Sequence, residues 1–170
     1  MTPSTKIDLS AFDKLRDDAT MRVFRIPGGA PPAKKGFAQG VLEALLAEWN
    51  SDDKIANGAV AFIAQDRFLL IGYELTGGDL SGCTKDQLTH TIQAIEQQFD
   101  REMLTAPRLA VEASDGGVEF LSQRQFRERR EASEIGEATV VYDHLVETVG
   151  AARGGFRTTV GESWYARVGG

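Results

Sequence analysis

Two stretches in which apolar residues recur every three or four positions constrain the fold of this 170-residue chain most strongly. Each has the period of a helix with one face packed against the rest of the protein. They lie within residues 36–49 and 84–103. Their apolar members are Phe37, Val41, Leu42, Leu45, Leu46 and Trp49 in the first, and Leu88, Ile92, Ile95, Phe99 and Met103 in the second. Both predicted helices need a flat apolar partner, which a β-sheet provides.

Short apolar runs before, between and after these two helices predict strands. The runs cover residues 21–26, 59–63, 68–71 and 109–113. The second and third runs hardly alternate between apolar and polar residues, which indicates a hairpin covered on both faces. The order β-α-β-β-α-β predicts an α+β fold, with two helices on one face of a mainly antiparallel sheet. This is the order of a ferredoxin-like core, which we expect at residues 21–113.

We treat residues 1–170 as a single domain, because neither an internal repeat nor a low-complexity linker divides them. Leu9, Phe12 and Leu15 follow helical spacing, so residues 1–20 are expected to form a short amphipathic helix or an arm docked on the domain. The end of the chain is expected to extend the core by a strand, a helix and a strand.

Residues 114–170 carry the signals of this C-terminal extension. An Asp-Gly pair directly after residue 114 is typical of a hairpin turn between two strands. Ser122 followed by Gln125 fits a capping box at the start of a third helix. Thr84 with Gln87 fits the same pattern at the start of the second helix. Later strands are predicted at residues 139–142 and 156–160, and a last helical turn at residues 162–167.

The composition predicts a soluble protein in the cytoplasm. The chain is 42% hydrophobic and 26% charged, the balance of an ordinary globular protein. No apolar run approaches the roughly 20 residues of a membrane-spanning helix, so no membrane partner is expected. The first 15 residues lack the apolar segment of a secretion signal. We therefore expect a cytoplasmic location.

Net charge and metal-binding residue types narrow the expected partners further. The net charge of −6 disfavours nucleic-acid binding by general phosphate neutralisation. One cysteine cannot form an internal disulfide. The single cysteine and the two histidines show no metal-ligand spacing. The sequence therefore predicts neither a metal site nor a cofactor, and it leaves a homo-oligomer open.

A glycine-rich loop before the second long helix is the segment that most suggests a binding site. Gly77 and Gly82 match the two glycines of the phosphate-binding pattern G-x-x-x-x-G-K-[ST], and Thr84 matches its hydroxyl position. The lysine position, however, holds Cys83. Without that ammonium group the loop cannot reach terminal phosphates, and Asp79 adds repulsion, so the pattern argues against nucleotide hydrolysis.

Our leading hypothesis from the sequence is a non-enzymatic module that binds a partner protein or a small anionic ligand. Its expected ligand-binding residues are Gly77, Gly78, Ser81, Gly82, Thr84 and Asp86. The main alternative is a small enzyme in which Cys83, near a helix N-terminus, acts as a thiolate nucleophile. His90 is a candidate catalytic partner, but about two helical turns, roughly 10 Å, separate it from Cys83. A base from elsewhere, such as His144, would then be needed.

Two further features suggest recognition surfaces. The third helix is locally basic. Its residues Arg124, Arg127 and Arg130 form a candidate patch that binds an acidic protein or RNA. The alternative is that these arginines simply form a solvated helix face. Trp164 and Tyr165, close to Arg167, form either a small recognition surface or an anchor for the end of the chain.

With these residues noted, the chain from Met21 to Val168 resembles a family of small bacterial proteins often labelled ABC transporter ATPases. The resemblance rests most on the Ser-Gly-Cys-Thr run at residues 81–84 with Asp86 and His90. Further matching segments are Ile135-Gly136, residues 139–142, Leu145-Val146 with Thr148, and Ser163-Trp164 with Arg167. The label conflicts with the missing phosphate-binding lysine and magnesium-binding aspartate, and the resemblance implies no established activity. Residues 118–142 also resemble small GYF-type peptide-binding modules, without their glycine-tyrosine-phenylalanine signature.

Overall fold

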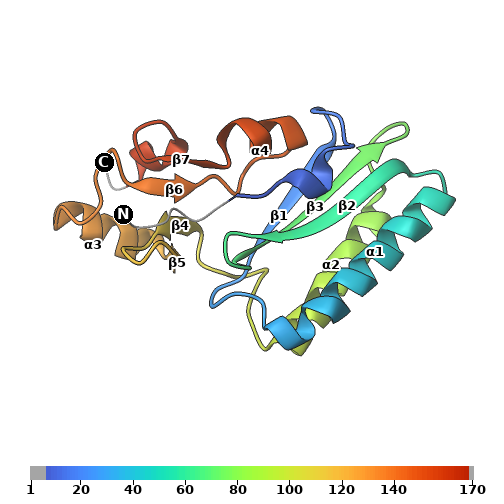
Figure 1. Ribbon diagram of the computed structural model, residues 1–170, viewed down its shortest axis with the longest axis horizontal. Coiled ribbons are helices and arrows are strands. Elements are labelled where there is room, and N and C mark those ends of the chain that lie inside the picture. The colour runs from blue at the N-terminus through green and yellow to red at the C-terminus, as the bar shows by residue number, and fades with distance from the viewer. Residues whose placement is uncertain (1–6, 169–170) are drawn as a thin grey trace.

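The computed structural model describes residues 7–168, which form two antiparallel sheets and four α-helices (Figure 1). The strands are β1 (Thr20–Arg25), β2 (Ile55–Ile63), β3 (Phe68–Leu75), β4 (Leu109–Glu112), β5 (Val118–Leu121), β6 (Val140–Tyr142) and β7 (Arg157–Thr159). The helices are α1 (Lys35–Ser51), α2 (Gly82–Phe99), α3 (Gln123–Glu131), α4 (Val149–Gly155), and the 3-10 helices η1 (Ser10–Phe12), η2 (Pro32–Lys34) and η3 (Trp164–Arg167). The predicted α+β class is confirmed. Within the described range, no helix combines the length and the apolar character needed to cross a membrane.

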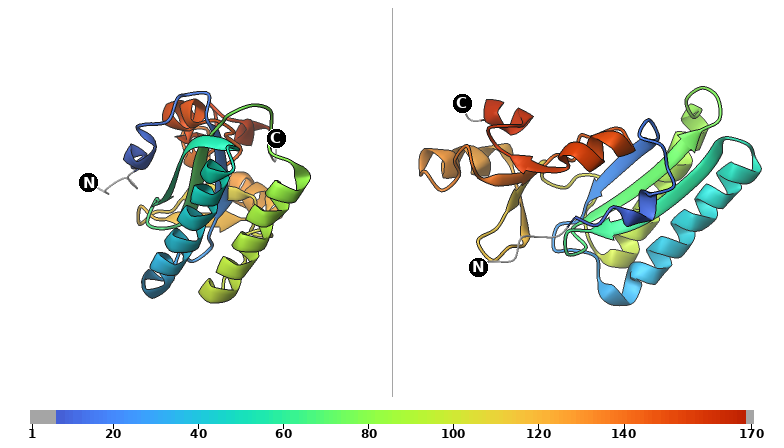
Figure 2. Two further views of the ribbon diagram at one scale, coloured as in Figure 1. Left: turned by 90° about the vertical axis from the view of Figure 1, so that its right-hand side faces the viewer. Right: turned by 45° about the horizontal axis from the view of Figure 1, so that its top comes forward.

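The first sheet has the strand order β1-β3-β2, and both pairings are antiparallel. Helices α1 and α2 lie side by side along one face of this sheet (Figure 2). Their apolar stripes pack on the sheet as predicted, and the helical residues buried in this first core are Ala38, Leu42, Leu46, Trp49, Leu88, Ile92, Ile95 and Phe99. Phe37 lies outside the core and is 43% exposed.

Strand β3 is the central strand and is buried on both faces, as the sequence predicts for residues 68–71. Leu69 and Ile71 belong to the first core under α1 and α2, whereas Phe68 and Leu70 belong to a second core on the opposite face. The predicted run at residues 59–63 of β2 is likewise covered on both faces, with Val60 in the first core and Ile63 in the second, whereas residues 56–58, which precede that run, are exposed.

The predicted ferredoxin-like core is not formed, because β4 does not join the first sheet. It lies instead in a second sheet with the order β5-β4-β6-β7. One edge of β4 pairs with β5 through the hairpin turn at Asp115-Gly116, where Gly116 has a φ of +88° that favours glycine. The other edge pairs with β6. For β4, pairing with a hairpin partner a few residues away costs less loop-closure entropy than pairing with the distant edge of β1.

The two sheets share the second core. Its buried residues come from the first sheet, from η1 and the segment after it, and from β4, β5, β6 and α4; they include Phe12, Leu15, Met21, Ile63, Leu70, Ala110, Val118, Val149 and Ala152. The ring of Phe68 lies at the centre of this core. Its centroid lies 5.0 Å from that of Phe156 and 5.5 Å from those of Phe120 and Tyr142. Aromatic rings from both sides of the boundary therefore hold the sheets together.

Helix α4 is not predicted by the sequence, because three of its seven residues are glycines, which disfavour helices. Thr148 starts it by accepting a hydrogen bond from the Ala151 N–H at 3.1 Å. Gly150 permits a close approach to the N-terminal arm, since a Cβ there would lie 2.8 Å from the Cβ of Asp17. Tertiary packing thus overrides local helix propensity here.

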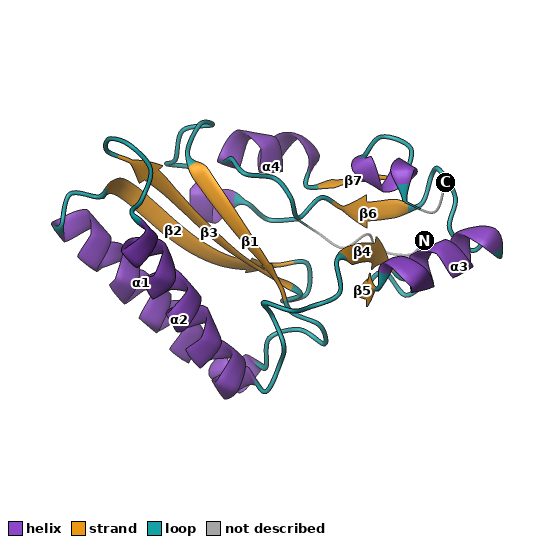
Figure 3. Cartoon of the chain, turned by 180° about the vertical axis from the view of Figure 1, so that it is seen from behind, coloured by secondary structure: helices purple, strands orange, loops and turns teal. Residues whose placement is uncertain are grey.

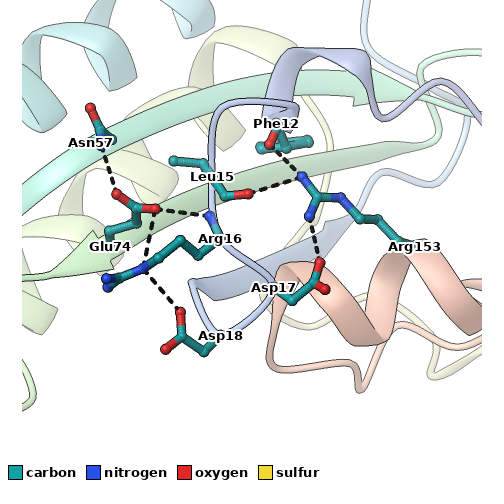
Figure 4. A network of polar contacts seen from close by, with 8 residues as sticks. All are labelled: Phe12, Leu15, Arg16, Asp17, Asp18, Asn57, Glu74 and Arg153. Carbon is teal, nitrogen blue, oxygen red and sulfur yellow. Dashed lines mark hydrogen bonds and ion pairs between the residues drawn. The ribbon is translucent and has the colours of Figure 1, made fainter.

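The N-terminal arm, residues 7–19, lies across the first sheet on the face opposite α1 and α2. Its only helical part is η1, which is three residues long. Phe12 and Leu15 are buried against Gly72 of β3, where a Cβ would lie 2.9 Å from both side chains. Arg153 of α4 donates hydrogen bonds to the carbonyls of Phe12 and Leu15, at 2.7 and 3.1 Å, and pairs with Asp17 at 2.6 Å (Figure 4).

A buried carboxylate fixes the end of the same arm. Glu74 of β3 accepts hydrogen bonds from the Asn57 side chain at 2.6 Å and from the Arg16 backbone N–H at 2.8 Å (Figure 4). These bonds, that of Asn57 first, lower the pKa of Glu74 below its usual value. A charged carboxylate with these partners holds the arm against the sheet.

Candidate functional site

The glycine-rich loop leads into α2, but the helix starts earlier than the sequence suggests. Ser81, and not Thr84, is the N-cap residue, because the Ser81 hydroxyl accepts a hydrogen bond from the Thr84 N–H at 3.2 Å. The predicted capping box at Thr84 and Gln87 is therefore wrong. Cys83 becomes the second residue of the helix, and its side chain is exposed.

The loop forms a hollow of about 250 Å³, and a lysine reaches it from another element. Lys54, between α1 and β2, donates a hydrogen bond from Nζ to Thr84 Oγ1 at 3.2 Å. The positive charge that the loop motif lacks thus comes from a residue thirty positions earlier. Asp79 also lines the hollow, and its hydrogen bond with Lys85 lowers the pKa of its carboxyl group. A fixed negative charge at this position opposes the binding of an anion.

The structure brings together only part of the set predicted around this loop. Gly77, Gly78, Ser81 and Thr84 line the hollow, together with residues of the preceding turn. Gly82, Cys83, Asp86 and His90 do not line it. The side chains of Cys83, Asp86 and His90 are exposed, and within residues 7–168 no hydrogen bond or ion pair joins them to one another. Within the described residues, the Cys83 thiol forms no hydrogen bond with a side chain that could act as its base.

The arginines of α3 are spread over different contacts. Arg124 pairs with Glu128 at 3.0 Å, and Arg130 pairs with Glu137 at 2.9 Å. Arg130 also donates to two backbone carbonyls in the last turn of the chain, those of Ala166 and Val168. Arg127 is exposed and has no ion pair within the described residues. The three arginines predicted as a patch therefore do not form one cluster of free cations.

A cavity of about 440 Å³ lies elsewhere, where two connections and two helix segments meet. We call it the Trp164 pocket. It is bordered by the α2–β4 connection, the start of α3, the β6–α4 connection and η3. Its lining residues are Thr105, Ala106, Pro107, Arg108, Leu109, Ser122, Gln123, His144, Leu145, Trp164 and Val168. Cavities of roughly 300–1,000 Å³ are typical of small-molecule sites.

The apolar wall of this pocket is built around Trp164. The indole Nε1–H donates a hydrogen bond to Asp143 at 3.1 Å, and the ring meets the His144 ring edge-on at a centroid distance of 5.8 Å. Leu145, on the same connection, is 58% exposed although its side chain is large and apolar. An apolar ligand would therefore find a fixed aromatic ring and an uncovered aliphatic side chain at one place.

Tyr165 holds this wall in position. Its hydroxyl is buried where the β4–β6 ladder ends; it accepts a hydrogen bond from the Ala110 N–H at 2.9 Å and donates one to the Tyr142 carbonyl at 2.7 Å. Burial raises the pKa of Tyr165 far above its usual value, so the phenol stays protonated and can donate. The ring also packs against that of Trp164, with centroids 4.3 Å apart and the ring planes tilted by 35°.

Of the two positive side chains at the pocket, Arg108 belongs to its lining and Arg25 contacts two of its lining residues. Arg25 of β1 donates to the carbonyls of Ala106 and Pro107, at 3.0 and 2.7 Å, and Arg108 is exposed beside them. Burial, and then the charge of Arg108, lower the pKa of Arg25. Within residues 7–168, neither arginine forms an ion pair with a carboxylate. The two like charges therefore repel each other, and no ion pair within the described residues neutralises either of them.

His144 also lines the pocket, and its side chain is neutral. A hydrogen bond joins its Nε2 to the carbonyl oxygen of Arg108, so Nε2 carries the proton. Burial lowers the pKa of His144 below its usual value, which keeps the imidazole uncharged near neutral pH. The fixed positive charge at the pocket therefore comes from the arginines.

The sequence indicates some of the residues at the Trp164 pocket but not the two arginines. The sequence predicts a recognition surface or an anchor at Trp164 and Tyr165. In the structure the two residues differ: Trp164 lines the pocket, and Tyr165 is buried. No local sequence pattern indicates Arg25 or Arg108, because their proximity depends on how the two sheets meet. Within the described range, no group of three His, Cys, Asp or Glu side chains is arranged to hold a metal ion.

Comparison with protein-family models, with curated proteins and with solved structures gives no match to this chain. The resemblance suggested by residues 81–84, Asp86 and His90 therefore stays a prediction, and functional inference depends on the geometry alone.

Proposed function

We propose that this protein is a non-enzymatic binding module, and that its Trp164 pocket takes a small apolar anion, such as a carboxylate that carries an aromatic or alkyl group. One observation carries the proposal: an apolar wall built on Trp164 and Leu145 adjoins two arginines that lack a carboxylate partner within residues 7–168. Cys83, the nucleophile of the enzymatic alternative, is not part of this pocket.

The two parts of the pocket suit the two parts of such a ligand. A guanidinium group binds a carboxylate or sulfonate through parallel N–H donors, and the exposed Arg108 is free to do so. The ring of Trp164 provides a rigid apolar surface for the other end. The repulsion between Arg25 and Arg108 would fall when an anion lies between them, which favours the bound state.

Charge reversal at Arg108 is expected to weaken anion binding strongly. The probe is 8-anilinonaphthalene-1-sulfonate, an aromatic anion whose fluorescence rises in apolar sites. We expect Arg108→Glu to raise its Kd by about tenfold or more, because a repulsive charge replaces the binding one and about 1.4 kcal/mol corresponds to tenfold. The measurement is a fluorescence titration, with thermal unfolding to confirm that each variant is folded.

Arg127→Glu is the matched control, because Arg127 is also exposed and without an ion pair within the described residues, but lies on α3 outside the pocket. It makes the same change in net charge and is expected to leave the Kd within about twofold. Equal weakening by both variants would indicate a general effect of net charge. That result, or no effect of Arg108→Glu, would contradict the proposed site.

A further inference from the structure

We infer that His144 is a third cationic group at the Trp164 pocket: its imidazole takes up a proton when the apolar anion binds, so that affinity rises as the pH falls. This coupling rests on the function proposed above. The β6–α4 connection carries His144 from the second sheet towards the edge of β1, where Thr148 forms a bridge with Thr20 (Figure 3). The ring is thereby placed in the wall of the pocket, beside Trp164.

Two side chains bind three successive carbonyl groups of the α2–β4 connection. Arg25 donates to those of Ala106 and Pro107. Nε2 of His144 donates to the next one, that of Arg108. A carbonyl oxygen only accepts, so Nε2 keeps its proton and Nδ1 is the ring nitrogen that can gain one. The proton comes from the buffer and adds to the Nδ1 lone pair, so the imidazole becomes charged without losing its contact with the pocket wall.

The groups that face the ring keep it neutral in the unbound protein. Burial is the main cause that lowers the pKa of His144, and the charge of Arg25 adds to it. Hydrogen bonds to backbone carbonyls, mainly that of Arg108, and the charge of Asp143 act in the opposite direction. A second hollow lined by His144 adds two positive and two negative side chains, which balance one another: Arg22, Lys85, Asp79 and Glu147.

A bound anion changes this balance. In the proposed complex its negative charge lies beside Arg108, which lines the same cavity as His144. A negative charge close to the imidazole favours the charged form and raises the pKa of His144. The bound protein then holds more protons than the unbound protein at any pH between the two pKa values. Affinity therefore rises as the pH falls through this interval, and it is constant above and below it.

The chain offers a matched control in His90, the second of its two histidines. His90 is exposed on α2 and lines neither the Trp164 pocket nor the second hollow. Its protonation changes the net charge by the same amount as protonation of His144. A comparison of the two residues therefore separates a local effect at the pocket from a general effect of net charge.

The test is a fluorescence titration with 8-anilinonaphthalene-1-sulfonate between about pH 8 and about pH 5.5, a range in which histidine titrates and the sulfonate stays ionised. Salt at about 0.15 M screens distant charges. We expect the Kd to fall at least about fivefold across this range in the unchanged protein and in His90→Gln. In His144→Gln, which keeps an N–H donor for the Arg108 carbonyl, it should stay within about twofold.

A second measurement needs no variant. Nuclear magnetic resonance follows the His144 ring through a pH titration of the unchanged protein, with and without saturating sulfonate. The midpoint should move to higher pH in the bound protein. Linkage also requires the total fold-change in Kd to equal the ratio of the acid dissociation constants of the ring in the unbound and the bound protein.

A constant Kd in the unchanged protein, or a His144 midpoint that the sulfonate does not move, would overturn the coupling and leave the binding itself in place. A pH dependence that persists in His144→Gln or disappears in His90→Gln would also overturn it, because the proton would then go to another group. Absence of sulfonate binding at every pH would instead contradict the proposed function, so the two failures are distinguishable.

Discussion

Replacing Phe68 with alanine is expected to lower the free energy of unfolding by about 3–5 kcal/mol, the range for large aromatic residues in a core. Phe68 has no exposed surface, and its ring contacts those of Phe120, Tyr142 and Phe156. Removing it leaves a cavity between the first sheet and the second. Chemical denaturation followed by circular dichroism measures the loss.

Phe37→Ala is the control for this change, because Phe37 is 43% exposed on α1 and contributes to neither core. It is expected to cost less than about 1 kcal/mol. We also expect the unmodified protein to unfold in one transition, since its sheets share the second core. Two separate unfolding transitions would contradict the shared core. So would a loss of unfolding free energy in Phe68→Ala as small as that in Phe37→Ala.

Tyr165→Phe is expected to cost about 1–3 kcal/mol although it removes a single oxygen atom, because it leaves buried polar groups without partners. The Ala110 N–H loses its acceptor and the Tyr142 carbonyl loses its donor. Hydrogen exchange of the Ala110 amide provides a local readout, and it should become faster in the variant.

The Tyr165→Phe substitution should also affect the Trp164 pocket, because Tyr165 packs against Trp164 and anchors η3. Binding of the aromatic sulfonate should therefore weaken together with stability. An unchanged stability and an unchanged exchange rate at Ala110 would show that the hydroxyl does not hold this part of the fold.

Local patterns explain which parts of the fold are predictable. The stripes ending at Trp49 and Met103 depend only on helical spacing, and the helices pack on a sheet as predicted, although α2 ends at Phe99, before Met103. The Asp115-Gly116 turn depends on two adjacent residues, and its hairpin is also confirmed. The placement of β4 depends on competition between two distant edges, which no local pattern encodes, and there the ferredoxin-like prediction is wrong.

The candidate site likewise contains residues that the sequence indicates and residues that only the fold brings together. Trp164 is noticeable in the sequence because it is a rare aromatic residue beside another. The meeting of Arg25 and Arg108 with that ring, and of Lys54 with Thr84, depends on tertiary packing. The glycine pattern at residues 77–84 is visible in the sequence, yet Asp79 and the exposed position of Cys83 make it the weaker candidate.

The pocket depends on the contact between the two sheets, because one of its walls is the α2–β4 connection, which leads from the first sheet and its helices to the second sheet. Arg25 of the first sheet fixes the α2–β4 connection through two carbonyls, and His144 of the β6–α4 connection bonds to the next residue of that segment. A change that separates the sheets should therefore also impair ligand binding.

The central claim, an apolar anion bound beside Trp164, is tested most directly by nuclear magnetic resonance of the two tryptophan indoles. Trp49 is the internal reference, since it is fully buried in the first core and its Nε1–H donates to Gln87 at 3.1 Å. On titration with 8-anilinonaphthalene-1-sulfonate, the Trp164 indole resonance should shift to saturation while that of Trp49 stays in place. A Trp164 resonance that does not move at saturating probe would contradict the account.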